Sequence, residues 1–558
     1  NPDALYLPVL AEVFRKRRYG RRGKGLMKRK VKFVDKLSLS YKIKNLGGAE
    51  KMKKFISILC LIAIVIGSLS LVGCKDNSAS KNSISVAIMA PDVASSEGTA
   101  ENNRWTKYIA EQTGLDITWV AIPQNEMKTK LNTLLAAGEA PDMFVEYNNA
   151  YFQGLVFDGM LMELDDLIEK HSTEYKKYIE KNSDLKTWTM LDGKTYAFTN
   201  RRPADKILCY GMWIRQDWLD KLNLKAPTTI DEFVEVAKAF KTLGDDIVPL
   251  AYPYQFINTI YNAYPQWYEK DDGSGLEYGV VTHRYSESIS MLKKFYDEGI
   301  VSKEYFVDKG GTKQYELWNS GKSGIIFSNW DPSVNQTLLK NDPNANLVQL
   351  EAFSTPYGTN GMYLEAPPQL YVMMNKDCKN PEAGMKLVDW LIGGGYKNLM
   401  FGEEGVHYQM DGDVPVTICD SDTYTREVDY ARKYAILADF VLNPEWIPKM
   451  ANKDELSQKL AAEKVDAMEV IGRHKFRRDI PYNPPVSRVS SIVSDFSASV
   501  NGITVKYITG GNQYDEKWCE TELKREWELA GGKEAEELAS KWYKENIDMI
   551  KKFQAENK

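Results

Sequence analysis

The stretches ISVAIM at residues 84–89, WTKYIAEQ at 105–112 and ITWV at 117–120 decide the fold. The first and third are short apolar runs typical of strands, and the second has the spacing of a helix. The order repeats, because a helix is predicted over 125–137 and a third strand over 143–145. Strands that alternate with helices predict βαβ units, a parallel sheet and right-handed crossovers, and therefore an α/β protein.

The alternation continues along the chain. Further strands are predicted over 210–214, 324–327 and 370–374, and a helix with a capping residue begins at Thr229. From about residue 420 onward the sequence is mostly helical and charged. The part that begins at Ser83 is too long for one small core, so we expect two lobes and a helical C-terminal region.

The first 73 residues differ in composition from the rest. Residues 1–51 carry 15 Lys and Arg against 4 Asp and Glu. Such a basic run could be a nucleic-acid arm. We favour a disordered, non-native upstream extension, because residues 52–73 form a complete export signal that should begin close to the start of a chain.

The export signal has a positive start at Met52-Lys53-Lys54 and an apolar run over 55–72. The run is long enough for a membrane span, but it ends in Leu71-Val72-Gly73-Cys74, which resembles the bacterial lipobox. That resemblance implies a lipidated Cys74 as the first residue of the mature protein. Residues 74–82 are polar and predict a flexible tether.

Removal of residues 1–73 leaves 55 Lys and Arg against 73 Asp and Glu, a net charge near −18. An acidic surface repels phosphate backbones and argues against nucleic-acid binding. Four cysteines of the mature part show no CxxC or zinc spacing, and the sequence leaves open whether two of them form a disulfide. They are Cys209, Cys378, Cys419 and Cys519.

Several phrases, in order, resemble family 1 of the extracellular solute-binding proteins, especially the large lipoprotein branch common in Gram-positive bacteria. They are 136–142 (AAGEAPD), 192–196 (DGKTY), 213–222 (WIRQDWLDKL), 226–233 (APTTIDEF), 402–408 (GEEGVHY) and 507–510 (YITG), followed by Trp518. The resemblance implies a two-lobed, type II periplasmic-binding-protein-like fold with hinge strands. It implies a monomeric subunit of an ABC importer, lipid-anchored on the extracellular face of the cytoplasmic membrane, that delivers a carbohydrate to the permease.

The resemblance also predicts how the lobes divide the chain. We expect residues 83–198 and 367–415 in lobe one, and 199–366 and 416–558 in lobe two. Relatives that bind alginate oligosaccharides often carry a calcium loop where this chain has only 241–250 (KTLGDDIVPL). Because calcium needs six to eight oxygen ligands, we expect no metal site, and no cofactor.

Ligand contacts are expected where strands end, because open α/β sheets bind ligands at the carboxyl ends of their strands. This argument nominates Trp330 and Asp331, Asp92, and the pair Tyr147 and Asn148. An aromatic ring suits the C–H face of a sugar, and the family often has one at the position of Trp330. Ordinary turn chemistry is the alternative for the polar residues.

Weaker candidates complete the predicted site. Packing within a loop is an equal alternative for the three aromatic residues, and a solvated surface position is the alternative for the arginine, which could hold an acidic sugar in bidentate fashion. These candidates are Tyr252, Tyr254, Trp267, Arg201 beside Arg202, Glu365 and His407. Trp213, Trp218, Trp390 and Trp518 are interpreted as core residues.

Two other classes of function compete with this interpretation. An exported glycoside hydrolase would need two opposed carboxylates, which the sequence cannot exclude. The chain has no HExxH, no GxSxG and no phosphate-binding glycine loop, and its four His have no ligand spacing. A peptide-binding or sensor lipoprotein is the second alternative.

Overall fold

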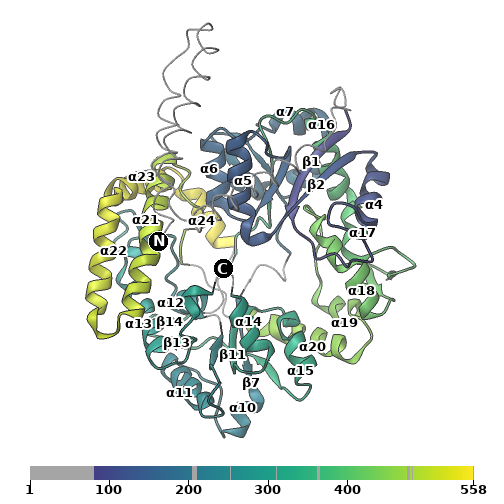
Figure 1. Ribbon diagram of the computed structural model, residues 1–558. Helices are drawn as coiled ribbons and strands as arrows, with labels where there is room; N and C mark the ends of the chain where they lie inside the picture. Colours follow the sequence, from purple (N-terminus) through teal and green to yellow (C-terminus); the bar gives the residue numbers. More distant parts are fainter. Residues whose placement is uncertain are drawn as a thin grey trace, which may run out of the picture. The chain divides into compact units, whose positions relative to one another are not determined.

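The computed structural model describes residues 81–203, 210–251, 253–308, 311–360, 365–473, 478–480 and 482–556, shown as ribbons in Figure 1. The predictions for the upstream extension, the export signal, Cys74 and Cys209 lie outside these residues, as does nearly all of the tether. Residues 79–558 form one compact unit. In the described part, no helix is long and apolar enough to cross a membrane.

The first sheet contains five strands in the order β2, β1, β3, β15, β6. Its strands are β1 (Ser83–Met89), β2 (Asp116–Ile122), β3 (Met143–Glu146), β6 (Ala197–Phe198) and β15 (Tyr371–Met374). β1 pairs in parallel with β2 and β3, whereas β15 runs antiparallel to β3 and β6. β1 is enclosed by neighbours, and Val86, Ala87 and Ile88 are fully buried. The βαβ prediction is confirmed over these strands.

Helices connect and cover the first sheet. α4 (Arg104–Thr113) begins at Asn103, whose side chain caps it, and ends at Gly114 in the left-handed conformation. α5 (Met127–Ala137) and α6 (Asn149–Phe157) flank β3, and α16 (Pro381–Trp390) packs on β1. The remaining helices of this part are α7 (Asp165–His171), α8 (Glu174–Lys181), α9 (Lys186–Thr189) and α17 (Tyr396–Phe401).

The second sheet contains four strands in the order β12, β7, β11, β8. These are β7 (Tyr210–Arg215), β8 (Leu250–Ala251), β11 (Ile325–Asn329) and β12 (Leu347–Gln349). β11 runs parallel to β8 but antiparallel to β7, so this sheet is mixed. Its helices are α10 (Gln216–Lys221), α11 (Ile230–Lys241), α12 (Pro253–Tyr261), α13 (His283–Asp297), α14 (Thr312–Asn319) and α15 (Gln336–Asn341).

Short hairpins and the helical C-terminal region complete the unit. The hairpins are β4 (Met190–Leu191) with β5 (Lys194–Thr195), β9 (Trp267–Glu269) with β10 (Leu276–Tyr278), β13 (Ser354–Thr355) with β14 (Gly358–Thr359), and β16 (Tyr408–Asp411) with β17 (Val414–Thr417). The late helices are α18 (Ser421–Glu427), α19 (Ile447–Met450), α20 (Glu455–Gly472), α21 (Ser487–Thr509), α22 (Glu516–Ala530), α23 (Gly532–Glu545) and α24 (Ile547–Glu556). The helical region predicted from residue 420 is confirmed.

The late helices belong to different surroundings. α20 packs on β12 of the second sheet, and α21 packs against α13, α22, α23 and, from the first-sheet side, α6. The segment between α18 and α19 contacts the first sheet, because the rings of Tyr434 and Trp119 lie 5.1 Å apart in an edge-to-face arrangement. The predicted lobe boundaries stay a prediction.

Three segments of the chain meet at Asn200, which lies in the sequence between β6 of the first sheet and β7 of the second sheet. The Arg202 N–H donates to the Pro367 carbonyl (2.7 Å), and the Gln369 N–H donates to the Asn200 carbonyl (2.9 Å). The buried Asn200 amide donates to the side chain of Gln369 (3.0 Å) and to the Ala438 carbonyl (2.9 Å). One side chain therefore ties together the segments near residues 200, 369 and 438.

Candidate ligand-binding site

A groove of about 520 Å³ lies where α5 and α6 face the segment that leads into α21. We call it the α6–α21 groove. One end of the groove is set by local chain chemistry, because Asn148 lies two residues after β3 and caps α6 by accepting from the Tyr151 N–H (2.9 Å). The groove is lined by Lys128, Asn132, Asn148, Ala150, Tyr151, Gly154, Leu155, Phe157, Asp158, Trp267, Asn483, Pro484, Ser487, Val489, Ser490, Ser491, Val493, Ser494 and Ser497.

Aromatic rings make the floor of the groove. Tyr151 is buried, and burial raises the pKa of its hydroxyl, which remains a neutral donor to Asn132 Oδ1 (2.8 Å). The ammonium of Lys128 lies 5.3 Å from the centre of the Tyr151 ring. Trp267 is also buried and packs against Tyr278, with the ring centres 5.3 Å apart. Packing against neighbouring side chains therefore holds both rings in place.

The rim of the groove is polar and comes from α21 and the residues before it. Serines recur every three or four residues along this helix, which places them on one face. The Gln153 amide donates to the Asn483 carbonyl (3.3 Å), and this bond ties α6 to the segment before α21. Hydroxyl and amide groups above aromatic rings are what a sugar requires, since its C–H face packs on the rings while its hydroxyls form hydrogen bonds.

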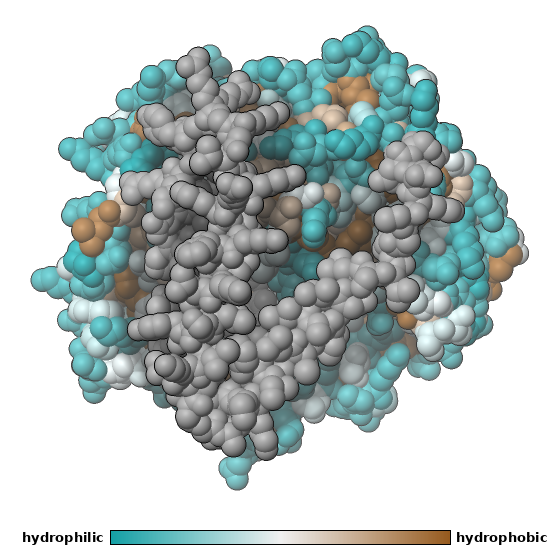
Figure 2. Space-filling view, turned by 45° about the horizontal axis from the view of Figure 1, so that its top comes forward, coloured by the Kyte–Doolittle hydropathy of each residue, from teal (hydrophilic) through white to brown (hydrophobic). Residues whose placement is uncertain are grey.

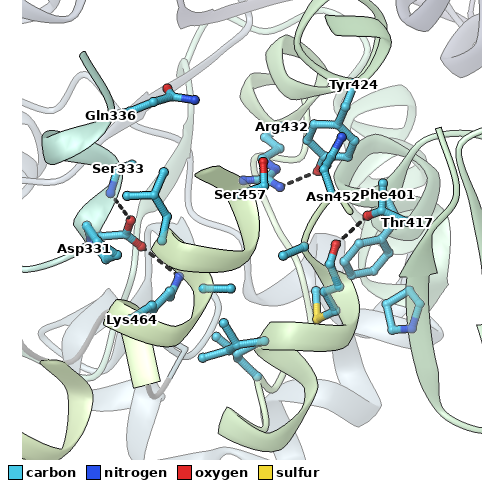
Figure 3. Close-up of a pocket in the computed structure, with 18 residues that line it drawn as sticks. Asp331, Ser333, Gln336, Phe401, Thr417, Tyr424, Arg432, Asn452, Ser457 and Lys464 are labelled. Carbon is cyan, nitrogen blue, oxygen red and sulfur yellow. Dashed lines mark hydrogen bonds and ion pairs between the residues drawn. The ribbon is translucent and has the colours of Figure 1, made fainter. Parts of the chain in front are cut away.

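A second cavity, of about 270 Å³, contains the predicted residue Asp331 (Figure 3). Asp331 follows β11, caps the turn at Ser333 and pairs with Lys464 of α20 at 2.7 Å. Opposite this pair in Figure 3, Arg432 donates to the Tyr424 hydroxyl (2.5 Å). The cavity is lined by Asp331, Pro332, Ser333, Gln336, Phe401, Pro415, Thr417, Tyr424, Arg432, Leu442, Ile447, Met450, Ala451, Asn452, Ser457, Leu460, Ala461 and Lys464.

Comparison with known proteins identifies the family. The model of the family described as "Bacterial extracellular solute-binding protein" matches residues 96–397, more than half of the chain. This chain belongs to that family. A relative from Bacillus subtilis (strain 168), named polygalacturonan/rhamnogalacturonan-binding protein YtcQ, is 31% identical over 348 residues, which are 58% of this chain and 67% of the relative.

Solved structures resemble the fold of this solute-binding protein. The alginate-binding protein AlgQ2 without calcium ion has a TM-score of 0.65 at 18% identity, over 84% of this chain and 99% of that one. The substrate-binding protein FusA of Streptococcus pneumoniae in complex with kestose has a TM-score of 0.64 at 16% identity, with the same coverage. The predicted two-lobed α/β fold is thereby confirmed.

The structure brings together only some of the predicted site residues. Asn148 and Trp267 line the α6–α21 groove, and Asp331 lines the second cavity. Trp330, the strongest sequence candidate, is only 1% exposed and packs in a core cluster with Trp213 and Trp318. Its ring is closed off by the surrounding side chains, and its role in ligand contact stays a prediction.

Other predicted residues lie outside both cavities. Asp92 is exposed after β1, and Tyr147 is 45% exposed. Arg201 pairs with Asp184 (2.5 Å), and Glu365 lies 3.8 Å from Arg202, beside the meeting point of the chain passes.

His407, Tyr252 and Tyr254 need separate mention. His407 is fully buried, where its Nδ1 accepts from the Glu403 N–H (2.9 Å) and its Nε2 faces Glu427 (3.3 Å). Tyr252 and the side chain of Tyr254 lie outside the described residues. The four tryptophans interpreted as core do pack in or against the core, with Trp213 buried and Trp218, Trp390 and Trp518 partly buried.

Metal and cysteine chemistry add little at either cavity. Across the described ranges, no cluster of three or more His, Cys, Asp or Glu could hold a metal ion. Cys378, Cys419 and Cys519 are free thiols. Burial raises the pKa of Cys378 and of Cys519 to about 12, so both remain protonated at neutral pH.

Sequence reasoning missed most of the groove. Tyr151 lies on a helix with no distinctive motif, and Asn483 contributes through a loop more than 300 residues farther along the chain. One usable signal was present, because Ser487, Ser490 and Ser494 repeat at helical spacing in a segment already predicted to be helical. Arg432 carried no such signal.

Proposed function

We propose that this solute-binding protein captures a carbohydrate, most simply an oligosaccharide, in the α6–α21 groove. The observation that carries the proposal is the combination of a buried aromatic floor, formed by Tyr151 and Trp267, with a rim of serine hydroxyls and asparagine amides. The names of relatives support it, since YtcQ is named for binding polygalacturonan and rhamnogalacturonan, and FusA was solved with kestose.

The energies suit reversible capture. Tyr151 and Trp267 are 8% and 3% exposed, so their rings offer a sugar only a small apolar face. Micromolar affinity corresponds to about −8 kcal/mol, and oriented hydrogen bonds of about 1 kcal/mol each from the serine and asparagine rim supply most of it in this proposal. The rim and the floor come from segments on both sides of the Asn200 meeting point. A ligand that touches both sides only when they approach would shift the population toward a closed state.

We extend the proposal from ligand capture to membrane anchoring and transport. In the proposal, acylated Cys74 anchors the protein to the extracellular face of the cytoplasmic membrane, and the monomeric closed complex passes its ligand to the permease subunits of an ABC importer. Lobe one would combine 83–198 with 367–415, and lobe two would combine 199–366 with 416–558. Tyr434, which packs on Trp119, would then lie at the contact between the lobes.

The groove favours binding over hydrolysis. Glycoside hydrolysis needs a pair of carboxylates on opposite sides of the scissile bond. Among the described residues that line the groove, Asp158 supplies the only carboxylate. A sugar held there would therefore leave unchanged, as a transport cargo must.

A titration with a matched pair of variants tests the proposal. Isothermal titration of the purified full-length chain with plant and microbial oligosaccharides, galacturonan fragments first, should show saturable binding. Ser494→Trp fills the groove from its exposed rim, and we expect at least a tenfold loss of affinity. Asn501→Trp places the same ring on α21 at an exposed position that does not line the groove, and should bind as the unmodified protein does.

The competing functions give different results in the same experiment. Chromatography of the ligand after incubation should recover it intact, and a cleaved product would point to an enzyme. Binding of peptides but of no carbohydrate would overturn the proposal. Unchanged binding in both tryptophan variants would place the site elsewhere on the protein.

A further inference from the structure

The cavity beside Asp331 has a chemistry that differs from that of the α6–α21 groove. Only two charged side chains line the groove, Lys128 and Asp158, one of each sign. The charged side chains among the described residues that line the cavity are Asp331, Lys464 and Arg432. Asp331 and Lys464 form an ion pair at 2.7 Å, whereas the acidic neighbour of Arg432, Asp429 at 3.7 Å, does not line the cavity.

Arg432 is held in place by its neighbours yet keeps donors for a ligand. Its Nη2 donates to the Tyr424 hydroxyl, and its Nη1 lies 3.7 Å from Asp429, beyond hydrogen-bonding distance. Among the described residues its other N–H groups have no hydrogen-bond partner, and the side chain is 50% exposed. A guanidinium has five donors in a planar fork, so Arg432 can still hold a carboxylate through two parallel bonds.

The other walls of the cavity suit a sugar ring. Phe401 and Tyr424 supply aromatic surface, and Leu442, Ile447 and Leu460 supply aliphatic surface. Polar groups stand among them, and Figure 3 shows Gln336, Asn452 and Ser457 around the same space as Arg432. A volume of about 270 Å³ lies below the range of about 300–1,000 Å³ that holds drug-sized ligands, so one ring fits rather than a chain.

The cavity is also separate in origin from the groove. Its walls come from the ends of β11 and β17, the turn after α18, and α19 and α20, and no residue lines both spaces. α19 contacts both β17 and α20, and Thr417 of β17 donates to the Met450 carbonyl (2.5 Å), which fixes one wall to the other. The cavity is therefore held by packing that does not depend on the groove.

We propose that the Arg432 cavity is a second carbohydrate site, selective for a single sugar ring that carries a carboxylate, with Arg432 holding the carboxylate and Phe401 and Tyr424 packing on the ring. The inference rests on the proposed function in one respect, the carbohydrate class of the ligand. It goes beyond that function by assigning a second place and a charge preference.

Galacturonate and galactose form a matched probe pair, because they share a ring and differ at C6, where one has a carboxylate and the other a hydroxymethyl group. Ligand-observed NMR titration of the full-length chain should give a dissociation constant for each. Hydrogen bonds to a charged group differ from neutral ones enough that we expect galacturonate to bind about 10- to 100-fold more tightly. Added salt should reduce this preference.

Variants of Arg432 test the assignment. Arg432→Gln should abolish the preference for galacturonate, and Arg432→Lys, which keeps the charge but loses the fork, should keep part of it. Arg525→Gln is the control, because Arg525 is also exposed on a helix and pairs with Glu522 (2.8 Å), but does not line the cavity. Unchanged unfolding temperatures would exclude misfolding as the cause.

The outcomes separate this inference from the proposed function. Equal binding of galacturonate and galactose, or a preference that survives Arg432→Gln, would overturn the Arg432 site while neutral oligosaccharides could still bind the groove. Loss of the preference in Arg432→Gln with intact binding of neutral oligosaccharides would support both. If no carbohydrate bound at all, the proposed function would fail and the second site with it.

Discussion

Asn200 offers a sharp test of how the chain passes are joined. Its side-chain amide is 2% exposed and donates to three acceptors, the Arg201 carbonyl (3.2 Å), the Gln369 side chain (3.0 Å) and the Ala438 carbonyl (2.9 Å). Asn200→Ala removes the donor and leaves three part-buried acceptors without this partner. Each such acceptor costs about 1–3 kcal/mol, and with relaxation at this segment we expect a total loss of about 2 kcal/mol.

Asn200→Asp should be worse than Asn200→Ala, although aspartate has nearly the same shape as asparagine. A carboxylate would face the same three oxygen acceptors with no proton to donate, and an uncompensated buried charge costs about 3–5 kcal/mol. Lowering the pH would protonate the aspartate and recover part of the loss. The sign is that of a carboxyl whose folded pKa is raised, so the defect appears as pH rises.

Urea unfolding of the three proteins at pH 5 and pH 8 measures both effects. Asn182→Ala is a comparison variant, because the Asn182 side chain accepts from Arg201 (3.1 Å) in a hydrogen bond that is exposed to solvent. It should change stability by less than 1 kcal/mol. The reasoning would be refuted if Asn200→Asp were as stable as Asn200→Ala at pH 8, or if all variants lay within 0.5 kcal/mol of the unmodified protein.

Three further predictions follow from local geometry. His283 Nδ1 lies 3.1 Å from Glu520, and the hydrogen bond between them raises the pKa of the histidine. The stabilisation that this pair gives is therefore complete below about pH 6.5 and is lost as the pH rises through the higher pKa of the folded state. Because the pair is largely exposed, His283→Gln should lower the unfolding free energy by only a few tenths of a kcal/mol at pH 5.5 and should not change it at pH 9. Gly211→Ala would place a Cβ 2.7 Å from Trp330 Cβ and should lower the unfolding free energy by about 1–3 kcal/mol. Gly502→Ala, inside α21, places a Cβ with no atom within 4 Å and should raise the unfolding free energy by up to about 1 kcal/mol. Equal unfolding temperatures for the two variants would contradict this expectation. In native-state thiol labelling at pH 8 read by mass spectrometry, Cys519, whose pKa burial raises to about 12, should react only on the timescale of unfolding, and rapid modification would show that its pocket opens.

On the face that Figure 2 shows, the described surface is mainly hydrophilic with apolar patches among the polar residues, and Asp and Glu outnumber Lys and Arg after residue 73. Charge of one sign over a surface favours solubility and disfavours nucleic acid. Composition alone could predict this, since surface residues need no specific partner. The same argument does not reach the interior, where each side chain depends on particular neighbours.

By itself, the sequence determined the alternating strands and helices at the start of the described chain, several later elements and their order. The run at 84–89 became β1, the capping prediction at Thr229 is confirmed by its bond from the Glu232 N–H (3.1 Å), and the helical region after residue 420 is present. These features depend on contacts within a few residues, such as the periodicity of apolar side chains and the capping of helix ends. Local chemistry was sufficient for them.

Only the tertiary structure decided which residues share a cavity. Asn148 and Trp267 were nominated separately, but nothing local linked them to Asn483 or to the serines of α21. Trp330 shows the reverse case, because its place after β11 predicted an open ring, whereas packing with Trp213 and Trp318 closes it off. The physical reason is that packing joins segments hundreds of residues apart, and one-dimensional periodicity carries no record of those partners.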